Sequence, residues 1–487
     1  MPKSDYILTV GLEIHAELKT LTKMFCDSKN DSDEPRPNVN ICPICMGHPG
    51  TLPVINKEAV KHVLKVGLAL GGRFSDFTEF DRKNYFYPDI PKGYQLSQYE
   101  FPLIVGGALT GVAITRVHLE EDTATSTHES RIMNRESGEY SLLDFNRAGV
   151  PLMELVTEPV IHSAKEAVDF ARELQLLLRY LGVSDANMEK GEMRVEANIS
   201  VNGKWKMENG KLGTKVEVKN LNSFRAVERA IAHESKRQRA LLESGQKVVQ
   251  ETRGWDEATG ATFTQRRKEE SYDYRYFPDP DLPKLAIKKI PEFAPERLKR
   301  EIPELPAAKR RRFIEVGLKE EDAATLVANR AVASLFEDAA KRLSSPEERA
   351  LAASYLTSDL MGLLKKGSAD ADTAVFPFGA AAVAELIRMI AEKKLSSRGA
   401  KDILQVLCEK GGAPEEIAQE KGLLQKSDVH ELGAVVDRII AENQKVAEDY
   451  KKGKAAALQF LVGQAMKATH GSGNPGVLRE LFIERLN

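Results

Sequence analysis

Hydrophobic and polar residues alternate along three segments in the N-terminal part of the chain, a pattern typical of strands that bury one face. From residue 7 to 18 the apolar positions are Leu8, Val10, Leu12, Ile14, Ala16 and Leu18. The polar positions between them include Glu13, His15 and Glu17. The alternation recurs over residues 193–201 and, more briefly, over residues 214–219. The pattern predicts an antiparallel sheet that buries one face and leaves a concave, charged face open.

The pattern changes near residue 295, after which Ala, Leu, Lys and Glu recur at helical spacing. Proline-containing segments at 290–295 and 302–306 predict a linker and then a turn, and a Gly-rich break at 410–414 divides the helical part. We therefore predict an α+β fold made of a catalytic cradle, an all-α helical domain and a small helical tail domain. Their predicted boundaries are residues 1–295, 296–410 and 411–487.

Composition excludes several classes of protein. The chain has 487 residues, of which 42% are hydrophobic and 29% are charged, the balance of a soluble globular protein with several domains. The net charge of -2 excludes a globally basic nucleic-acid coat, so any RNA contact is local. The chain has neither an apolar run long enough to span a bilayer nor an apolar leader, which predicts a cytoplasmic protein. Four cysteines in so long a chain exclude a disulfide framework, and Cys408, alone in a helical pattern, is expected in the core.

The polar positions of the predicted strands carry candidate ligands for a cation. Glu13 and His15 lie two residues apart on one strand face, where both could reach one ion or two adjacent ions. Glu196 and Glu217 occupy polar positions of the other two alternating segments. An ordinary solvated face explains any single strand, but carboxylates gathered on several strands repel one another unless a cation neutralises them. The combination therefore favours a cation-binding face.

Residues 80–98 are dense in aromatic and cationic side chains. Arg82 and Lys83 could hold phosphate groups, because their side chains donate charge-assisted hydrogen bonds. The tyrosines of this region could stack on a base or simply pack the loop. The segment is therefore a candidate for nucleotide contacts, with a structural loop as the alternative.

Acidic residues also stand at a strand end and within an apolar run. Residues 120–122 are three consecutive acids, which can hold a hard cation through oxygen, although an ordinary acidic turn has the same sequence. Strand parity with His118 favours Glu120 for the polar face unless a bulge intervenes. Glu154 lies among apolar neighbours, where an unpaired carboxylate is costly, so it is expected to have a partner. A local salt bridge and an edge position are the alternatives.

Six motifs, in this order, resemble the GatB family, the B-type subunits of bacterial tRNA-dependent amidotransferases, and the resemblance covers nearly the whole chain. The motifs are residues 11–18, 81–89, 115–122, 219–224, 273–278 and 460–467. The family makes glutaminyl- or asparaginyl-tRNA from the mischarged species, as a carbon–nitrogen ligase with glutamine as the amido donor.

The resemblance implies a mechanism and partners. ATP and Mg²⁺ would serve to phosphorylate the side-chain carboxylate of Glu-tRNA(Gln), Asp-tRNA(Asn) or both, because a free carboxylate is a poor electrophile. Ammonia released from glutamine by the A-type subunit, an amidase, would then displace the phosphate. A small C-type subunit would help to hold the A-type and B-type subunits together in a heterotrimer. The resemblance also implies a cradle similar to the glutamine synthetase catalytic domain and a tail of YqeY-like type that contacts tRNA.

The same resemblance implies roles for individual residues. It assigns His15, Glu121 and Glu154 as magnesium ligands, and we follow it for Glu121 although parity favours Glu120. The residues implied around neighbouring metal or nucleotide positions are Glu13, Glu196 and Glu217, with Arg82 and Lys83 as candidate phosphate contacts. The family often has Asp at the position of Glu196, which leaves the geometry of that side chain open.

The cysteines depart from the pattern of the family. Many relatives carry C-x-C followed by C-x2-C, a tetrahedral zinc site, whereas this chain has Cys26, Ser28, Cys42 and Cys45 at those positions. Three thiolates together with Asp27, His48 or water could still bind Zn²⁺, and loss of the site is the alternative.

Two basic runs, residues 309–312 and 451–454, are candidates for contacts with RNA phosphates, although such runs are usually solvated. The resemblance favours the second run. Two other functions stay open: a tRNA-binding scaffold that has lost catalysis, and a metal-dependent hydrolase that needs no ATP. The scaffold is disfavoured because the acids and the imidazole are all present.

Overall fold

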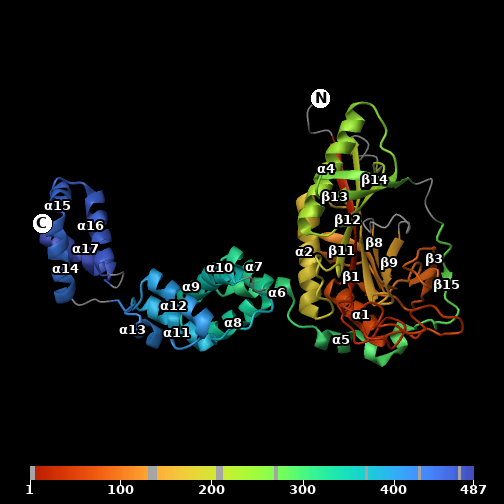
Figure 1. Ribbon diagram of the computed structural model, residues 1–487, viewed down its shortest axis with the longest axis horizontal. Coiled ribbons are helices and arrows are strands. Elements are labelled where there is room, and N and C mark those ends of the chain that lie inside the picture. Colours follow the sequence, from red (N-terminus) through yellow and green to blue (C-terminus); the bar gives the residue numbers. More distant parts are fainter. Residues whose placement is uncertain are drawn as a thin grey trace. The chain divides into compact units, whose positions relative to one another are not determined.

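The computed structural model describes residues 6–129, 140–203, 212–267, 273–367, 371–425, 429–469 and 473–486. The chain divides into two compact units, residues 1–305 and residues 306–487. In Figure 1 the first unit, coloured from red to green, carries the strands, and the second, coloured towards blue, carries helices.

A ten-stranded sheet forms the first unit, with the strand order β14-β13-β12-β11-β1-β10-β7-β5-β2 and with β6 paired to β7. Its central strands are β1 (Tyr6–Glu17), β10 (Pro151–Thr157), β7 (Val112–Glu121), β11 (Met193–Gly203) and β12 (Val216–Leu221). Its outer strands are β13 (Glu251–Asp256), β14 (Ala261–Arg267), β5 (Ile104–Val105), β2 (Arg73–Phe74) and β6 (Ala108–Leu109). The described neighbours pair in antiparallel fashion except β12 and β13, which are parallel. The predicted antiparallel sheet is therefore mixed, because α4 (Phe224–Glu243) joins that pair as a crossover helix.

Three helices pack on the apolar face of the sheet: α1 (Lys57–Ala69), α2 (Ala164–Leu181) and α4. The structure confirms the alternation predicted for residues 7–18, since the apolar positions from Leu8 to Leu18 are at most 7% exposed. Capping side chains start the helices at Asn56, Ser163 and Ser223, where a side-chain oxygen accepts backbone N–H groups. Figure 1 shows α2 and α4 along one side of the strands. The polar face of the sheet is thus turned away from these helices.

Two smaller sheets lie on the side away from α2 and α4 (Figure 1). One is a three-stranded sheet in the order β15-β3-β4, and the other is the hairpin β8-β9. The strands are β3 (Asp81–Asn84), β4 (Tyr94–Ser97), β15 (Phe277–Pro278), β8 (Thr125–Glu129) and β9 (Tyr140–Asp144). Strand β4 packs on β7, so the three-stranded sheet borders the polar face.

The segment predicted as a linker before residue 295 is folded onto the first unit. It contains the short helices η2 (Ile287–Lys289) and η3 (Pro291–Phe293), followed by α5 (Pro295–Glu301). Phe293 is buried in the core of the first unit, and α5 packs on α1. The compact units accordingly divide only after Leu305, while the domain boundaries at 295 and 410 stay predictions.

The second unit is helical, as its spacing predicts. Its first helices are α6 (Pro306–Glu315), α7 (Glu320–Ala328), α8 (Arg330–Ala340), α9 (Pro346–Ser354), the π-helical turn η4 (Tyr355–Leu360), α10 (Met361–Lys366), α11 (Ala380–Ala391), α12 (Ser397–Lys410) and α13 (Pro414–Glu420). The last four are α14 (Val429–Glu442), α15 (Gln444–Lys451), α16 (Ala455–Ala468) and α17 (Pro475–Leu486), which share a core of their own. Among the described residues, each helix is too short or too polar to cross a membrane.

Candidate functional site

The register of the central strands brings the predicted acids and imidazoles onto one face. His15 on β1 lies opposite Glu154 on β10, and Glu154 lies opposite His118 on β7. Glu13, two residues from His15, lies opposite Glu196 on β11. Residues directly opposite each other on neighbouring strands point to the same face, so these side chains form a continuous polar surface.

Glu154 is the centre of this surface. Its Oε2 atom lies 3.3 Å from Nε2 of His15 and 3.5 Å from Nε2 of His118. His15 also lies 3.8 Å from a carboxylate oxygen of Glu13, and His118 lies 3.5 Å from Glu120. Three groups of residues bring their ligand atoms within 4.8 Å of one another: Glu13–His15–Glu154, His118–Glu120–Glu154 and Glu13–Glu196–Glu217. We call the residues of these three overlapping groups the carboxylate–imidazole cluster.

Burial and like charges shift the pKa values in this cluster. Burial, followed by the charges of Glu154 and Glu196, raises the pKa of Glu13 to about 7. Burial alone would raise the pKa of Glu154, but His118 and His15 hold it well below its ordinary value. Burial opposes protonation of His118, yet Glu154 and Glu120 raise its pKa to about 9. Glu154 therefore already has cationic partners, whereas Glu13, Glu196 and Glu217 gather carboxylates whose mutual repulsion a divalent cation would relieve.

Three cationic side chains contact the cluster. Lys83 from β3 places Nζ 3.9 Å from Glu120, and Arg116 lies 3.5 Å from Glu154. Lys219 on β12 lies 2.8 Å from Glu196. Burial would lower the pKa of Lys83, but Glu120 and neighbouring groups raise it, so the ammonium stays charged. These cations can neutralise an anionic ligand that displaces their carboxylate partners.

The two adjacent acids at the end of β7 are in different environments. Glu120 joins the cluster and accepts hydrogen bonds from Ser97 Oγ at 2.5 Å and Gln95 Nε2 at 2.8 Å. Glu121 points to the other side of the strand, where it accepts hydrogen bonds from Lys92 and from the backbone N–H of Leu96 at 2.9 Å. Strand parity therefore holds to the end of β7. The role of Glu121 as a magnesium ligand stays a prediction, since it is outside the three groups found among the described residues.

Arg82 is engaged away from the cluster. Its Nε donates to Asp279 at 2.6 Å, its Nη2 lies 3.3 Å from Asp281, and its guanidinium stacks 4.3 Å from the centroid of the Tyr94 ring. These contacts tie the segment around β15 to β3. Its predicted contact with phosphate stays untested, and the local contacts give Arg82 a positioning role in the fold.

Comparisons with known proteins identify the family of the chain. The model of the "GatB/GatE catalytic domain" matches residues 8–291, and the model of the "GatB domain" matches residues 334–486. The chain belongs to the GatB family. It is 46% identical to the B subunit of the aspartyl/glutamyl-tRNA(Asn/Gln) amidotransferase of Thermomicrobium roseum, over 99% of both chains. The proteins of the same description from Moorella thermoacetica and Carboxydothermus hydrogenoformans are 43% and 42% identical over 99% of this chain and 100% and 99% of theirs.

The cysteines of this GatB chain form a second candidate metal centre. The sulfur atoms of Cys26, Cys42 and Cys45 lie within 4.8 Å of one another, with Ser28 Oγ 3.9 Å from Cys45. A hydrogen bond with Cys26 is the largest of several contributions, among them the ammonium of buried Lys23, that lower the pKa of Cys45 to about 5. Three sulfur atoms at such distances suit a zinc ion. Asp27 and His48 are outside this group in the described part of the chain.

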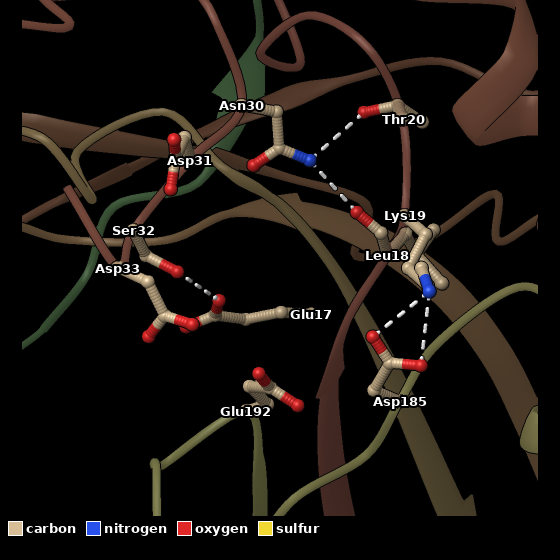
Figure 2. A pocket seen from close by; sticks show the side chains of 10 residues that line it. All are labelled: Glu17, Leu18, Lys19, Thr20, Asn30, Asp31, Ser32, Asp33, Asp185 and Glu192. Atoms are coloured by element: carbon tan, nitrogen blue, oxygen red, sulfur yellow. Dashed lines mark hydrogen bonds and ion pairs between the residues drawn. The ribbon is translucent and has the colours of Figure 1, made fainter. Parts of the chain in front are cut away.

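Sequence patterns did not indicate a cavity of about 210 Å³ at the end of β1, shown in Figure 2. Its acidic lining residues are Glu17, Asp31, Asp33, Asp185 and Glu192. Lys19 bonds to Asp185 at 3.0 Å, and Ser32 Oγ donates to Glu17 at 3.1 Å (Figure 2). Residues 17–20 and 30–33 meet Asp185 and Glu192 here, more than 150 positions later in the sequence, which is why no local motif reveals the cavity.

Proposed function

We propose that this chain is the ATP-dependent kinase and transamidase component of a tRNA-dependent amidotransferase. It phosphorylates the side-chain carboxylate of Glu-tRNA(Gln), Asp-tRNA(Asn) or both, and ammonia then displaces the phosphate to form the amide. The observation that carries the proposal is the carboxylate–imidazole cluster, bordered by Lys83 and Lys219 on the polar face of the sheet. Membership of the GatB family supports it further.

Cations are needed because both reacting groups are anions. Transfer of a phosphoryl group to a carboxylate requires that their repulsion be screened and that the groups be held in line, which bound Mg²⁺ supplies. The residues fit such an ion, since Glu13, Glu196 and Glu217 bring three carboxylates together, and burial with the charges of Glu154 and Glu196 raises the pKa of Glu13. His15 and Glu154 would hold it. The geometry favours Glu120 over Glu121 as the third ligand, and Glu13, Glu196 and Glu217 form a second group with the same chemistry.

The side chains of the chain itself have distinct tasks in this reaction. Lys83 and Lys219 exchange their carboxylate partners for phosphate oxygens of ATP and so bind the nucleotide. His118, charged and 2% exposed, keeps Glu154 ionised and in place. The aminoacyl group would approach beside Glu13, Glu217 and Lys219, whose side chains are 26%, 23% and 38% exposed.

The proposal also assigns the source of the ammonia and the contact with tRNA. The A-type amidase supplies ammonia and the small C-type protein joins the assembly, in keeping with relatives that are described as subunits. The tail helices from α14 to α17 contact tRNA. The cradle shares its fold with the glutamine synthetase catalytic domain, and the enzyme is a cytoplasmic carbon–nitrogen ligase with glutamine as amido donor.

Zinc has a structural role in the proposal. Cys26, Cys42 and Cys45 would hold Zn²⁺ with Ser28 or water completing the tetrahedron. Zinc analysis of the purified chain should find about one ion, which Cys45→Ser releases and Cys408→Ser retains, because Cys408 is remote in sequence and outside the group.

The test uses the chain assembled with its partner subunits, γ-labelled ATP and each mischarged tRNA. The wild-type enzyme should transfer label only when aminoacyl-tRNA is present. A scaffold would leave transfer unaffected by substitution of Glu154, and a metal-dependent hydrolase would turn over without ATP; either result would refute the proposal.

A further inference from the structure

Five tyrosines from three separate segments form a continuous row beside the candidate site. The ring of Tyr85 contacts Tyr87 and Tyr274, with centroid distances of 6.0 and 5.7 Å. Tyr274 contacts Tyr276 at 6.1 Å, and Tyr276 stacks on Tyr99 at 4.4 Å with an angle of 13° between the rings. We call these residues the tyrosine row.

The ends of the row are open to solvent, whereas its middle is partly buried. Tyr87 is 49% exposed, and Tyr99 is 62% exposed although one of its faces is stacked on Tyr276. Exposed apolar surface marks an interaction site when it is contiguous and rimmed by polar residues, and Tyr85, Tyr274 and Tyr276 join the two exposed rings into one row. The outer surface of the row therefore offers ring faces to a planar ligand.

Lys83 connects the tyrosine row to the carboxylate–imidazole cluster. Its Nζ lies 5.3 Å from the centroid of the Tyr274 ring, 6.0 Å from that of Tyr85 and 3.9 Å from Glu120. The hydroxyl of Tyr85 donates to Gln95 at 3.0 Å, and Gln95 donates to Glu120 at 2.8 Å. The ammonium of Lys83 and the side-chain amide of Gln95 thus lie between the tyrosine row and Glu120.

Backbone hydrogen bonds and an ion pair fix the segment that carries Tyr274 and Tyr276 to β3. Asn84 binds the backbone carbonyl of Tyr274 through its own N–H at 2.9 Å, and β15 pairs with β3. Arg82 fixes the same segment through Asp279. The rings are therefore positioned before any ligand arrives, which lowers the entropy cost of binding.

We propose that the tyrosine row stacks the bases at the single-stranded 3′ end of the tRNA and so delivers the esterified amino acid to the cluster. This inference rests on the proposed function, since it names the surface that holds the substrate of that site. Aromatic rings stack any base, and a cation beside them attracts the phosphates. Several rings in sequence suit several successive bases, whereas the adenine of one ATP would fill a single position, so we assign the row to RNA.

The test measures binding of tRNA to the assembled enzyme, with intact tRNA and with tRNA that lacks its three 3′-terminal nucleotides. Wild type should bind the trimmed tRNA more weakly. Tyr99→Ala should bind intact tRNA about tenfold more weakly than wild type, and trimming should then have little further effect. Tyr99→Phe keeps the ring and should behave as wild type, as should Phe263→Ala, which removes an exposed ring from β14.

Three outcomes would overturn the inference. Equal sensitivity to trimming in wild type, Tyr99→Ala and Tyr87→Ala would show that the row does not hold the RNA end. Loss of affinity for ATP in Tyr99→Ala, with tRNA binding unchanged, would assign the row to adenine. If wild type itself neither binds mischarged tRNA nor phosphorylates it, the proposed function fails and the inference fails with it, whereas the first two outcomes leave phosphorylation by wild type intact.

Discussion

The carboxylate–imidazole cluster and the acidic cavity of Figure 2 both include side chains of β1, and both are rich in acids. They differ in the cations that contact those acids. In the cavity, Asp185 is paired with Lys19, and Glu17 is bound by Arg147 at 2.8 Å. In the cluster, Glu154 is shared by His15, His118 and Arg116. The cluster also holds Glu13, Glu196 and Glu217, three carboxylates that share the ammonium of Lys219 and the imidazole of His15. This group leaves negative charge that a bound cation can balance.

The largest expected effect separates these two regions directly. Glu154→Gln should lower phosphoryl transfer to mischarged tRNA roughly a thousandfold, because it removes the charge that both imidazoles share. Asp33→Asn in the cavity should leave the rate within about twofold of wild type, since Asp33 contacts an exposed lysine, Lys190. Single-turnover transfer of label measures both, and basal glutaminase activity of the partner is the control for assembly. Full transfer by Glu154→Gln would remove the cluster from the mechanism.

The two adjacent acids at the end of β7 should respond differently to substitution. Glu120→Gln should lower transfer roughly a hundredfold and raise the Mg²⁺ concentration needed for half-maximal rate, since Glu120 faces Glu154 and His118. Glu121→Gln should change the magnesium requirement little, because its carboxylate binds Lys92 and Leu96 instead. Magnesium titrations of the two variants decide between them. A larger change of the magnesium requirement in Glu121→Gln than in Glu120→Gln would show that Glu121 is the ligand, as the family resemblance implies.

Strand period alone predicts which side chains of β1 face the site, so Glu13 and His15 were identifiable from local alternation. The same parity, applied to Glu120, also points to His118, which the ligand sets assigned from the sequence omitted. The register could not be predicted, because Glu154 arrives from a strand that follows long loops in the sequence. The partner of Arg82 could not be predicted either. Its charge suggested a contact with phosphate, but its guanidinium binds Asp279, which lies nearly two hundred residues later.

A third prediction uses magnesium and pH. The raised pKa of Glu13, about 7 against an ordinary 4.5, means that its proton stabilises the fold below pH 4.5 and that this stabilisation is lost as pH rises through 7. Mg²⁺ can replace that proton, so the rise in melting temperature on adding Mg²⁺ should be small at pH 5 and a few degrees at pH 8.

Thermal unfolding with and without Mg²⁺ at the two pH values provides the measurement. Glu154→Gln should lose most of the increase at pH 8. Glu17→Gln should keep it, although burial and Asp122 also raise the pKa of Glu17 to about 7, because Glu17 is outside the cluster. An equal increase at both pH values would show that the ion does not compete with protons at these acids.

The smallest expected effect concerns the tail, which contrasts with the cluster because its cations are exposed rather than buried. Replacement of Lys451, Lys452 and Lys454 by Ala should weaken binding of tRNA by the assembled enzyme several-fold at low salt and reduce the slope of log affinity against log salt. Lys454 and Lys452 contact Asp449 and Glu448 at 3.1 and 3.7 Å, and these exposed pairs are weak enough to yield to phosphate. The rate at saturating tRNA should not change, since the lysines act on binding alone.

Replacement of Lys309, Arg311 and Arg312 by Ala is the matched control: Lys309 and Arg312 are bound to Glu337, so we expect the salt slope to stay as in wild type. A reduced slope in the control and an unchanged slope in the tail variant would move the RNA contact to α6.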